Sequence, residues 1–435
     1  MRLTGGTKPD MDKTAVVRTL GCRLNSADTA LIQARLESIG YTVLPDDAES
    51  FDLAVLNTCA VTAEAVRKSR QELRKLKKLC PAAVIAVAGC AVEASEETFR
   101  REGADLVLTN PDKKDIAEIL SGHPALNRAS RDMTENFREA ASAVFPFRSR
   151  AFVKVQEGCN NFCTYCIVPH VRGRERSRKF DEVVSECRRL VGKGFPELVL
   201  TGVNTCAYSD DGKDLGGLVR AVAALPGDFR IRLSSTEPHV NNRSILNVMA
   251  ETPKVCRFLH LSLQHGCDRI LKAMNRHYRA EEYADFVAEA RARIPDIHVG
   301  SDVIAGFPGE TEEDFAVCAD FVRRMAFANL HVFVYSPRPG TPAAVMPGRP
   351  ETAVAERRAA ELRNIGRESG KEFIRSQIGK ELPVIFETVS GGTARGWSDN
   401  YIQCGMPAGS VRTGTIVRIT GDEKNLFAVK DQISS

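Results

Sequence analysis

The stretch GCNNFCTYC, residues 158–166, places Cys159, Cys163 and Cys166 at spacings of four and three residues. It directly follows a β-branched and aromatic run over 151–156 that predicts a strand. Three thiols this close together suit a disulfide set, a zinc site that lacks a ligand, or an iron–sulfur site with one open position. The surrounding sequence has to distinguish these three kinds of site.

The composition of the chain makes a disulfide set the least expected of these three kinds of cysteine site. The chain has 435 residues, 13 cysteines and a formal net charge of +4. No run approaches the roughly 18 apolar residues of a spanning helix, and the first residues lack the apolar centre of a signal peptide, so we expect a cytoplasmic protein without a membrane segment. Cysteines in a reducing compartment are more often metal ligands, redox groups or small buried hydrophobes than disulfides.

The first part of the chain, over 13–125, alternates strand and helix patterns. Strands are predicted at 14–20, 52–56, 83–88 and 105–108, with helices between them. Such alternation predicts a parallel α/β sheet, in which functional groups lie outside the carboxyl ends of the strands. Cys22, Cys59 and Cys90 each follow one of the first three strands, so we expect them at one edge of this sheet.

Two further regions follow a charged linker predicted over 126–150. Residues 151–372 contain six predicted strands separated by helices, which indicates most of a parallel α/β barrel, closed or open. These strands are expected at 151–156, 197–200, 231–234, 258–263, 298–304 and 329–335. Residues 373–435 carry short strands and glycine-rich turns, which predict a small β-barrel.

The cysteine triplet is a poor zinc site. A structural zinc site has four ligands, usually in two close pairs, and no second pair lies near this triplet. Three thiolates on one loop can instead hold three irons of a four-iron cluster and leave the fourth iron open to another ligand. The spacing C-x-x-x-C-x-x-C therefore favours the open iron–sulfur site.

This spacing, with Tyr165 before the last cysteine, resembles the radical S-adenosylmethionine motif. The segments TLGCRLNSADT, NTCAVTAEAVRKSRQ, AGCAVE, DVIAGFPGETEEDF and VFVYSPRPGTPA are together similar to the radical methylthiotransferases, in order and over nearly the whole chain. The resemblance implies two [4Fe–4S] clusters, an auxiliary one on Cys22, Cys59 and Cys90 and a radical-generating one on Cys159, Cys163 and Cys166. It also implies two S-adenosylmethionine molecules per turnover, one to methylate the sulfur and one to form a 5′-deoxyadenosyl radical.

The resemblance further implies a cradle for S-adenosylmethionine at the carboxyl ends of the barrel strands. Its expected members are Tyr165, Gly202, Asn204, Ser234, Glu237, Gln264 and Ile304. For each of them, an ordinary cap at a strand end is the other explanation. His265, Cys267 and Cys206 depart from the usual residues of the family, and the sequence assigns them no role.

Basic residues indicate an RNA partner. Arg67, Arg70, Arg74 and Lys77 recur at helical spacing on one face, and Arg172 and Arg174 begin a second basic run. Phosphate contacts and a merely solvated face both explain such patterns. The C-terminal barrel resembles the RNA-binding TRAM module, in which Phe386, Trp397 and Tyr401 are possible stacking residues or core residues.

The family acts on an adenosine beside the tRNA anticodon or on an aspartate of a ribosomal protein. The sequence segments around Cys22 and Cys59 are most similar to those of the MtaB-type branch, which modifies N-threonylcarbamoyladenosine. We therefore expect this activity, with the tRNA anticodon loop, an electron donor such as a flavodoxin or ferredoxin, and a sulfur donor as partners. The alternatives are isopentenyladenosine tRNA, the ribosomal aspartate, and a non-catalytic iron–sulfur protein that binds RNA or acts as a sensor.

Overall fold

The computed structural model describes residues 13–123, 149–234, 236–237 and 243–427. The predicted linker over 126–150 lies outside the described residues except for its last two positions. The chain divides into two compact units, 1–147 and 148–435, and each is described by itself. Among the described helices, none combines the length and the apolar content that crossing a lipid bilayer requires.

The first unit is a parallel sheet with the strand order β2-β1-β3-β4-β5. Its two central strands, β3 and β4, are buried along their whole length, as expected for a parallel sheet covered on both faces. Its strands are β1 (Lys13–Thr19), β2 (Tyr41–Leu44), β3 (Leu53–Thr58), β4 (Val84–Gly89) and β5 (Leu106–Leu108). Its helices are α1 (Arg23–Ser38), α2 (Ala63–Leu79), α3 (Cys90–Ala94), α4 (Glu96–Arg101), η1 (Pro111–Lys114) and α5 (Ile116–Ser121).

The parallel sheet predicted for the first unit is confirmed, and one strand of it was missed. Strand β2 follows a turn at Gly40, whose φ of +85° suits glycine, and pairs in parallel with β1 from Tyr41 to Leu44. Only Tyr41 of its four residues is buried. An edge strand this short carries too little hydrophobic alternation to be recognised from sequence.

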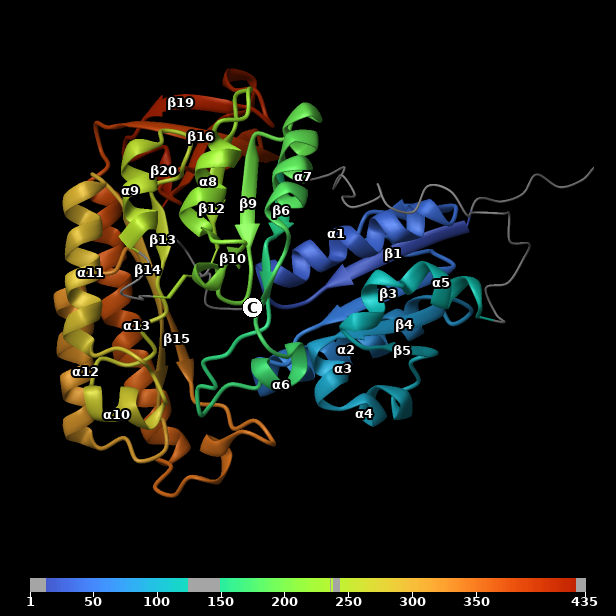
Figure 1. Cartoon of the computed structure of the whole chain (residues 1–435), viewed down its shortest axis with the longest axis horizontal. Helices are drawn as coiled ribbons and strands as arrows, with labels where there is room; N and C mark the ends of the chain where they lie inside the picture. Colours follow the sequence, from blue (N-terminus) through green and yellow to red (C-terminus); the bar gives the residue numbers. More distant parts are fainter. Residues whose placement is uncertain (1–12, 124–148, 235, 238–242, 428–435) are drawn as a thin grey trace, which may run out of the picture. The chain divides into compact units, whose positions relative to one another are not determined.

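The second unit begins with a partial barrel of parallel strands (Figure 1). Bridges from Ile231 to Val255 and from Thr236 to Leu261 join its two three-stranded sheets, and β6 and β15 form the open edges in the part described. The barrel strands are β6 (Arg150–Lys154), β9 (Glu197–Thr201), β12 (Arg230–Leu233), β13 (Phe258–His260), β14 (His298–Ala305) and β15 (Asn329–Val334). All six were predicted, and the barrel is open.

Helices and short connecting elements complete the partial barrel. The helices are α6 (Val168–Arg172), α7 (Phe180–Gly192), η2 (Thr205–Ala207), α8 (Leu215–Ala223), α9 (Arg243–Glu251), α10 (Asp268–Ala273), α11 (Ala280–Arg293), α12 (Glu312–Met325), η4 (Pro342–Val345) and α13 (Thr352–Arg375). The short strands are β7 (Gln156–Glu157), β8 (Arg176–Ser177), β10 (Ser209–Asp210) and β11 (Lys213–Asp214).

The C-terminal region forms an antiparallel sheet with the order β19-β16-β17-β18-β20. Its elements are β16 (Glu381–Ser390), β17 (Thr393–Ser398), β18 (Gln403–Pro407), η5 (Ala408–Ser410), β19 (Ile416–Thr420) and β20 (Leu426–Phe427). A β-barrel was expected here, but over residues 381–427 the outer strands β19 and β20 do not pair with each other. The region therefore has short antiparallel strands, as predicted, but they form an open sheet.

The aromatic residues of this sheet pack within the protein. Phe386 is fully buried in the core of the sheet. The rings of Trp397 and Tyr401 stack with their centroids 4.7 Å apart, and Tyr401 lies at the same distance from Phe258 of the barrel. In this arrangement the three side chains serve packing, which was one of the two roles considered for them.

A buried carboxylate joins the barrel to the C-terminal sheet. Glu197 accepts hydrogen bonds from Arg230 Nε at 2.6 Å and Arg232 Nε at 2.9 Å. Burial would raise the pKa of Glu197, but these two guanidinium groups hold it well below its usual range. The other nitrogens of the two arginines donate to the backbone carbonyls of Pro383, Trp397, Ser398 and Asp399. Figure 1 shows this sheet, in red, at the end of the barrel where β9 and β12 begin.

His298 lies in the same buried contact, and its burial predicts a loss of stability in acid. It packs against Phe258, Phe373 and Tyr401. Burial and the nearby charge of Arg232 lower the pKa of His298 to about 3. The unfolded chain binds a proton here from about pH 6.5 downward, whereas the folded chain does so only near pH 3, so this contribution to stability is lost as the pH falls through that window.

We predict that replacing His298 by phenylalanine reduces the loss of stability in acid. The difference in the free energy of unfolding between pH 7 and pH 5 should be about 2 kcal/mol smaller in His298→Phe than in the wild type. Denaturant titrations of the cluster-free protein at both pH values measure it. His298→Gln provides a second neutral side chain, and equal pH dependence in all three proteins would contradict the prediction.

Candidate active site

The loop that carries Cys159, Cys163 and Cys166 is closed at its base by backbone contacts. Strands β7 and β8 pair on either side of it, and the amide of Cys159 donates to the carbonyl of Gly173 at 3.2 Å. Gly158 has a φ of +73°, and a Cβ there would lie 2.0 Å from the carbonyl oxygen of Arg174. Only glycine fits this close approach, so the first cysteine is held at the carboxyl end of the barrel.

Each of the three thiols has an N–H donor directed at its sulfur. The amide of Asn161 lies 3.5 Å from Cys159 Sγ, and the amide of Val168 lies 3.4 Å from Cys166 Sγ. Burial raises the pKa of Cys159 to about 11 and that of Cys166 to about 12. Without a metal these two groups are neutral thiols at pH 7, and metal binding would release their protons.

Arg276 supplies the third donor and was not predicted from sequence. Its Nη1 lies 3.1 Å from Cys163 Sγ and 3.0 Å from a carboxylate oxygen of Glu237. The side chain is almost fully buried, at 3% exposure. Arg276 is 113 residues from Cys163, and the segment MNRHY that contains it carries no spacing that indicates this contact.

Gln156 is the second residue that sequence reasoning missed. Its Oε1 accepts from the amides of Val203 and Asn204, both at 3.0 Å, and its Nε2 donates to the carbonyl of Gly158 at 2.8 Å. A Cβ at Gly202 would lie 2.9 Å from the same Oε1. Gln156 therefore fixes the end of β9 against the start of the cysteine loop.

The predicted cradle residues Asn204 and Glu237 lie close to the cysteine loop, and Ser234 directly follows β12. Glu237 accepts from Asn161 Nδ2 and, at 3.3 Å, from Asn204 Nδ2. Ser234 Oγ and Asn204 Oδ1 are buried and have no hydrogen-bond partner among the described residues. A buried polar atom left unpartnered costs free energy, so both atoms suit a ligand that is bound in the working protein.

The other predicted cradle residues lie on the neighbouring strands. Gln264 has a φ of +69°, and its carbonyl accepts from the amide of Ile304 at 2.8 Å, which places the two residues side by side after β13 and at the end of β14. Tyr165 packs against the apolar cluster that contains Ile304, Phe307 and Tyr335. All seven predicted residues are thus at the carboxyl ends of barrel strands or in the loops that follow them.

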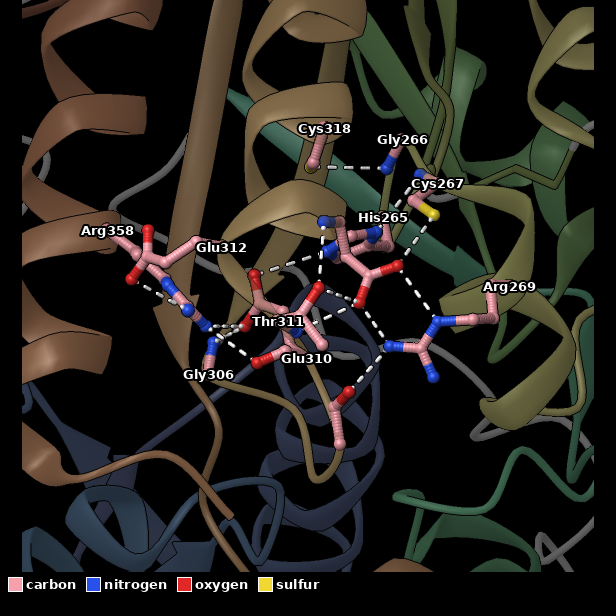
Figure 2. Close-up of polar contacts among 12 residues, drawn as sticks. His265, Gly266, Cys267, Arg269, Gly306, Glu310, Thr311, Glu312, Cys318 and Arg358 are labelled. Carbon is pink, nitrogen blue, oxygen red and sulfur yellow. Dashed lines mark hydrogen bonds and ion pairs between the residues drawn. The ribbon is translucent and has the colours of Figure 1, made fainter. Parts of the chain in front are cut away.

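His265 and Cys267 belong to a buried polar network that holds two of these loops together (Figure 2). The amide of Cys267 donates to His265 Nδ1 at 3.0 Å, and His265 Nε2 lies 3.3 Å from Glu310 Oε1. Arg358 of α13 contacts the other oxygen of Glu310 at 3.2 Å, and Cys267 Sγ donates to Asp314 at 3.3 Å. This network gives the two residues a positioning role next to Gln264. Cys206, by contrast, is a thiol whose pKa burial raises to about 12, and it has no evident role.

The first unit brings three further cysteines to one edge of its sheet. Strands β1, β3 and β4 are neighbours, and Cys22, Cys59 and Cys90 follow them at their carboxyl ends, as predicted. A Cβ at Gly21 would lie 2.8 Å from Cys59 Sγ, and one at Gly89 would lie 2.8 Å from Asn57 Oδ1. Glycine at both turns therefore lets the ends of neighbouring strands approach each other closely.

The basic residues of α2 have acidic partners within the first unit. Arg67 bonds Glu64 at 2.6 Å, and Arg70 and Arg74 share Glu102, which follows α4. Lys77 donates to the carbonyl of Gly103. Surface ion pairs of this kind contribute little to stability and can exchange for a phosphate, so these contacts leave RNA binding open.

Two basic residues of the second run lie within the cysteine loop, between β7 and β8, and make contacts there. Arg172 is buried, and its Nη1 lies 2.9 Å from Glu157 Oε1. The guanidinium carbon of Arg174 lies 4.3 Å from the centre of the Phe162 ring. These contacts show that both side chains help to hold the loop, a role that the sequence did not suggest.

Comparison with known proteins identifies two matching family models and many relatives. The model described as the Radical SAM superfamily matches residues 153–322, and the one described as Uncharacterized protein family UPF0004 matches residues 14–109. The tRNA-2-methylthio-N(6)-dimethylallyladenosine synthase of Maricaulis maris is 37% identical over 414 residues, covering 90% of each chain.

Relatives named as threonylcarbamoyladenosine tRNA methylthiotransferases are about as similar to this chain as the Maricaulis maris protein is. The threonylcarbamoyladenosine tRNA methylthiotransferase MtaB of Thermotoga maritima is 33% identical over 398 residues, covering 90% of this chain and 91% of the relative. The Bacillus subtilis protein of the same name is 34% identical over 420 residues, covering 93% of each chain. Among solved structures, the radical S-adenosylmethionine methyltransferase TsrM of Kitasatospora setae has a TM-score of 0.56 at 16% identity over 77% of each chain, which indicates a shared fold.

Proposed function

The chain belongs to the radical S-adenosylmethionine tRNA methylthiotransferases, and we propose that its substrate is N-threonylcarbamoyladenosine beside the anticodon. It is an enzyme, and its family uses two [4Fe–4S] clusters and S-adenosylmethionine. The proposed reaction replaces the hydrogen on carbon 2 of the adenine by a methylthio group. The observation that carries the methylthiotransferase chemistry is the presence of two separate cysteine triplets, each at the carboxyl ends of parallel strands.

The residues present fit these cofactors. We assign Cys159, Cys163 and Cys166 to the cluster that binds S-adenosylmethionine, because their loop carries three thiols and three N–H donors that would stabilise thiolate charge. We assign Cys22, Cys59 and Cys90 to the auxiliary cluster. The unpartnered Ser234 Oγ and Asn204 Oδ1 support S-adenosylmethionine as the ligand of the cradle.

An adenine C2–H has no useful acidity near pH 7, so acid–base groups alone do not suffice. When bound, the cluster and S-adenosylmethionine supply a radical that removes this hydrogen as an atom. The protein's own residues have three tasks around it. Arg276 donates to Cys163, Gln156 fixes the strand end against the loop, and Glu237 accepts hydrogen bonds from Arg276, Asn161 and Asn204 and so orients them.

The choice between the two tRNA substrates needs more than overall identity, because relatives of both names match at 33–37%. The sequence segments around Cys22 and Cys59 resemble those of the threonylcarbamoyladenosine branch and support threonylcarbamoyladenosine as the substrate. Methylthiolation of dimethylallyladenosine is the second candidate, since relatives with that name are as similar. We further propose a flavodoxin- or ferredoxin-like electron donor, a separate sulfur donor, and a TRAM-like RNA-binding role for residues 373–435.

We predict that the two cysteine triplets contribute separately to the iron content. The anaerobically reconstituted wild type should hold about eight irons, and a Cys22→Ala, Cys59→Ala, Cys90→Ala variant about four, because each triplet holds one four-iron cluster. The variant should still cleave S-adenosylmethionine but transfer no sulfur. Cys80→Ala, a cysteine of the same unit outside the triplet, is the matched control and should retain the full iron content. Equal iron in the triple variant and the wild type would rule out the second cluster.

We predict that the reduced enzyme prefers tRNA that carries N-threonylcarbamoyladenosine. The assay offers this tRNA and isopentenyladenosine tRNA in competition, with S-adenosylmethionine and sulfide, and identifies the nucleosides by mass spectrometry. The ribosomal protein substrate is offered in a separate reaction. Preferred modification of the isopentenyl tRNA would favour the second candidate function, and modification of neither tRNA would contradict the tRNA activity altogether.

We predict that the basic face of α2 binds RNA phosphates. The Arg67→Gln, Arg70→Gln, Arg74→Gln variant should bind tRNA more weakly, and the slope of log affinity against log salt should fall by roughly 0.7–0.9 for each phosphate that the variant no longer neutralises. An Arg100→Gln, Arg101→Gln variant on α4 is the matched control, because these arginines are also exposed and paired with acids. If both variants bind tRNA as the wild type does, the α2 face is only solvated.

A further inference from the structure

Three polar side chains that the proposed mechanism does not use lie together on neighbouring barrel strands. His260 of β13 and His331 of β15 flank Asp302 of β14. His260 Nε2 lies 3.0 Å from one oxygen of Asp302, and His331 Nδ1 lies 3.2 Å from the other. We call these three residues the His–Asp–His cluster.

The cluster lies on the inner face of the partial barrel. Ser301, the residue before Asp302, bonds the hydroxyl of Tyr283 on helix α11, so Ser301 points to the helical side. Successive residues of a strand point to opposite faces, so Asp302 points inward, as does Ile304 two residues later. Ile304 is a predicted cradle residue, and two residues of strand span roughly 7 Å. The cluster therefore lies two residues along the strand, roughly 7 Å, from the proposed cofactor position.

The cluster is charged and still accessible. Burial would raise the pKa of Asp302, but His260 and His331 hold it well below its usual range. The side chains of His260, Asp302 and His331 are 11%, 22% and 38% exposed. Water that contacts the carboxylate and the two imidazoles is displaced when a ligand binds, and this costs free energy unless the ligand supplies hydrogen bonds in its place.

Two ligand classes match these groups. Two imidazoles and a carboxylate within 4.8 Å of one another are also a donor set for a divalent transition metal. However, each Asp302 oxygen already faces one imidazole nitrogen at hydrogen-bond distance, and the other ring nitrogen of His331 lies 3.0 Å from Asn329 Nδ2. The cluster is thus a complete hydrogen-bonded unit without an ion, which favours a polar organic ligand.

We infer that the His–Asp–His cluster binds the polar substituent on N6 of the substrate adenosine, an inference that rests on the proposed function. A threonylcarbamoyl group has a hydroxyl and ureido N–H groups that can donate to Asp302. A dimethylallyl group is a hydrocarbon and would displace water from these partly exposed side chains without supplying a hydrogen bond in return. Sites that hydrogen-bond a polar substrate reject analogues without those groups far more strongly than apolar pocket contacts do.

The inference is tested by the substrate preference of variants of the full, cluster-loaded enzyme. Asp302→Asn and His331→Leu should lower kcat/KM for threonylcarbamoyladenosine tRNA by at least about tenfold and leave kcat/KM for isopentenyladenosine tRNA within about twofold. His331→Gln, which keeps a polar side chain, should lose less. His277→Leu removes an exposed imidazole in the segment between α10 and α11 and is the matched control. Iron content and cleavage of S-adenosylmethionine without tRNA verify that each variant is folded and loaded.

The outcomes separate this inference from the proposed function. If the wild type prefers threonylcarbamoyladenosine tRNA and the variants keep that preference, only the inference is wrong. If the wild type prefers isopentenyladenosine tRNA, both are wrong. Titration of the cluster-free protein with cobalt(II) tests the metal alternative, and a visible spectrum that appears in the wild type but not in His331→Leu would overturn the inference in favour of a metal site.

Discussion

Parallel strand pairing is the constraint on which both cysteine triplets depend. Parallel strands that are adjacent in a sheet end at the same edge. Strand pairing therefore brings residues that are far apart in sequence to that edge. Cys22, Cys59 and Cys90 are joined in this way over nearly seventy positions of sequence, whereas the second triplet is local to one loop. The two triplets are therefore positioned by different means: register between strands in one unit, and a glycine-locked loop in the other.

Much of the fold and the cysteine positions followed from sequence because the signals are local. A strand, its last residue and the following cysteine all lie within a few positions, and the spacing of Cys159, Cys163 and Cys166 is itself the motif. The sequence did not predict the features that depend on which strands pair with each other. Strand β2 is too short to show a pattern, and the closure of the C-terminal sheet depends on whether its two outer strands meet, which alternation alone does not specify.

The partners of several charged residues could not be predicted, because they come from distant positions in the sequence. Arg70 and Arg74 bond Glu102, which follows another helix. Arg276 donates to Cys163, which is more than one hundred residues away in sequence. The same holds for His265 and for the His–Asp–His cluster, whose members belong to separate elements. In each case the residue type was visible in the sequence, but its role depends on which strands and loops become neighbours.

The contact between the barrel and the C-terminal sheet has a consequence for how this protein can change over generations. Arg230 and Arg232 donate to main-chain carbonyls at 383 and 397–399, and every amino acid provides such a carbonyl. Replacements at these four positions therefore preserve the acceptors as long as the backbone keeps its path. The hydrogen bonds from Arg230 and Arg232 can therefore persist while these side chains diverge, whereas the ion pairs of Arg150 with Glu387 and of Arg257 with Asp399 require their acids to be kept.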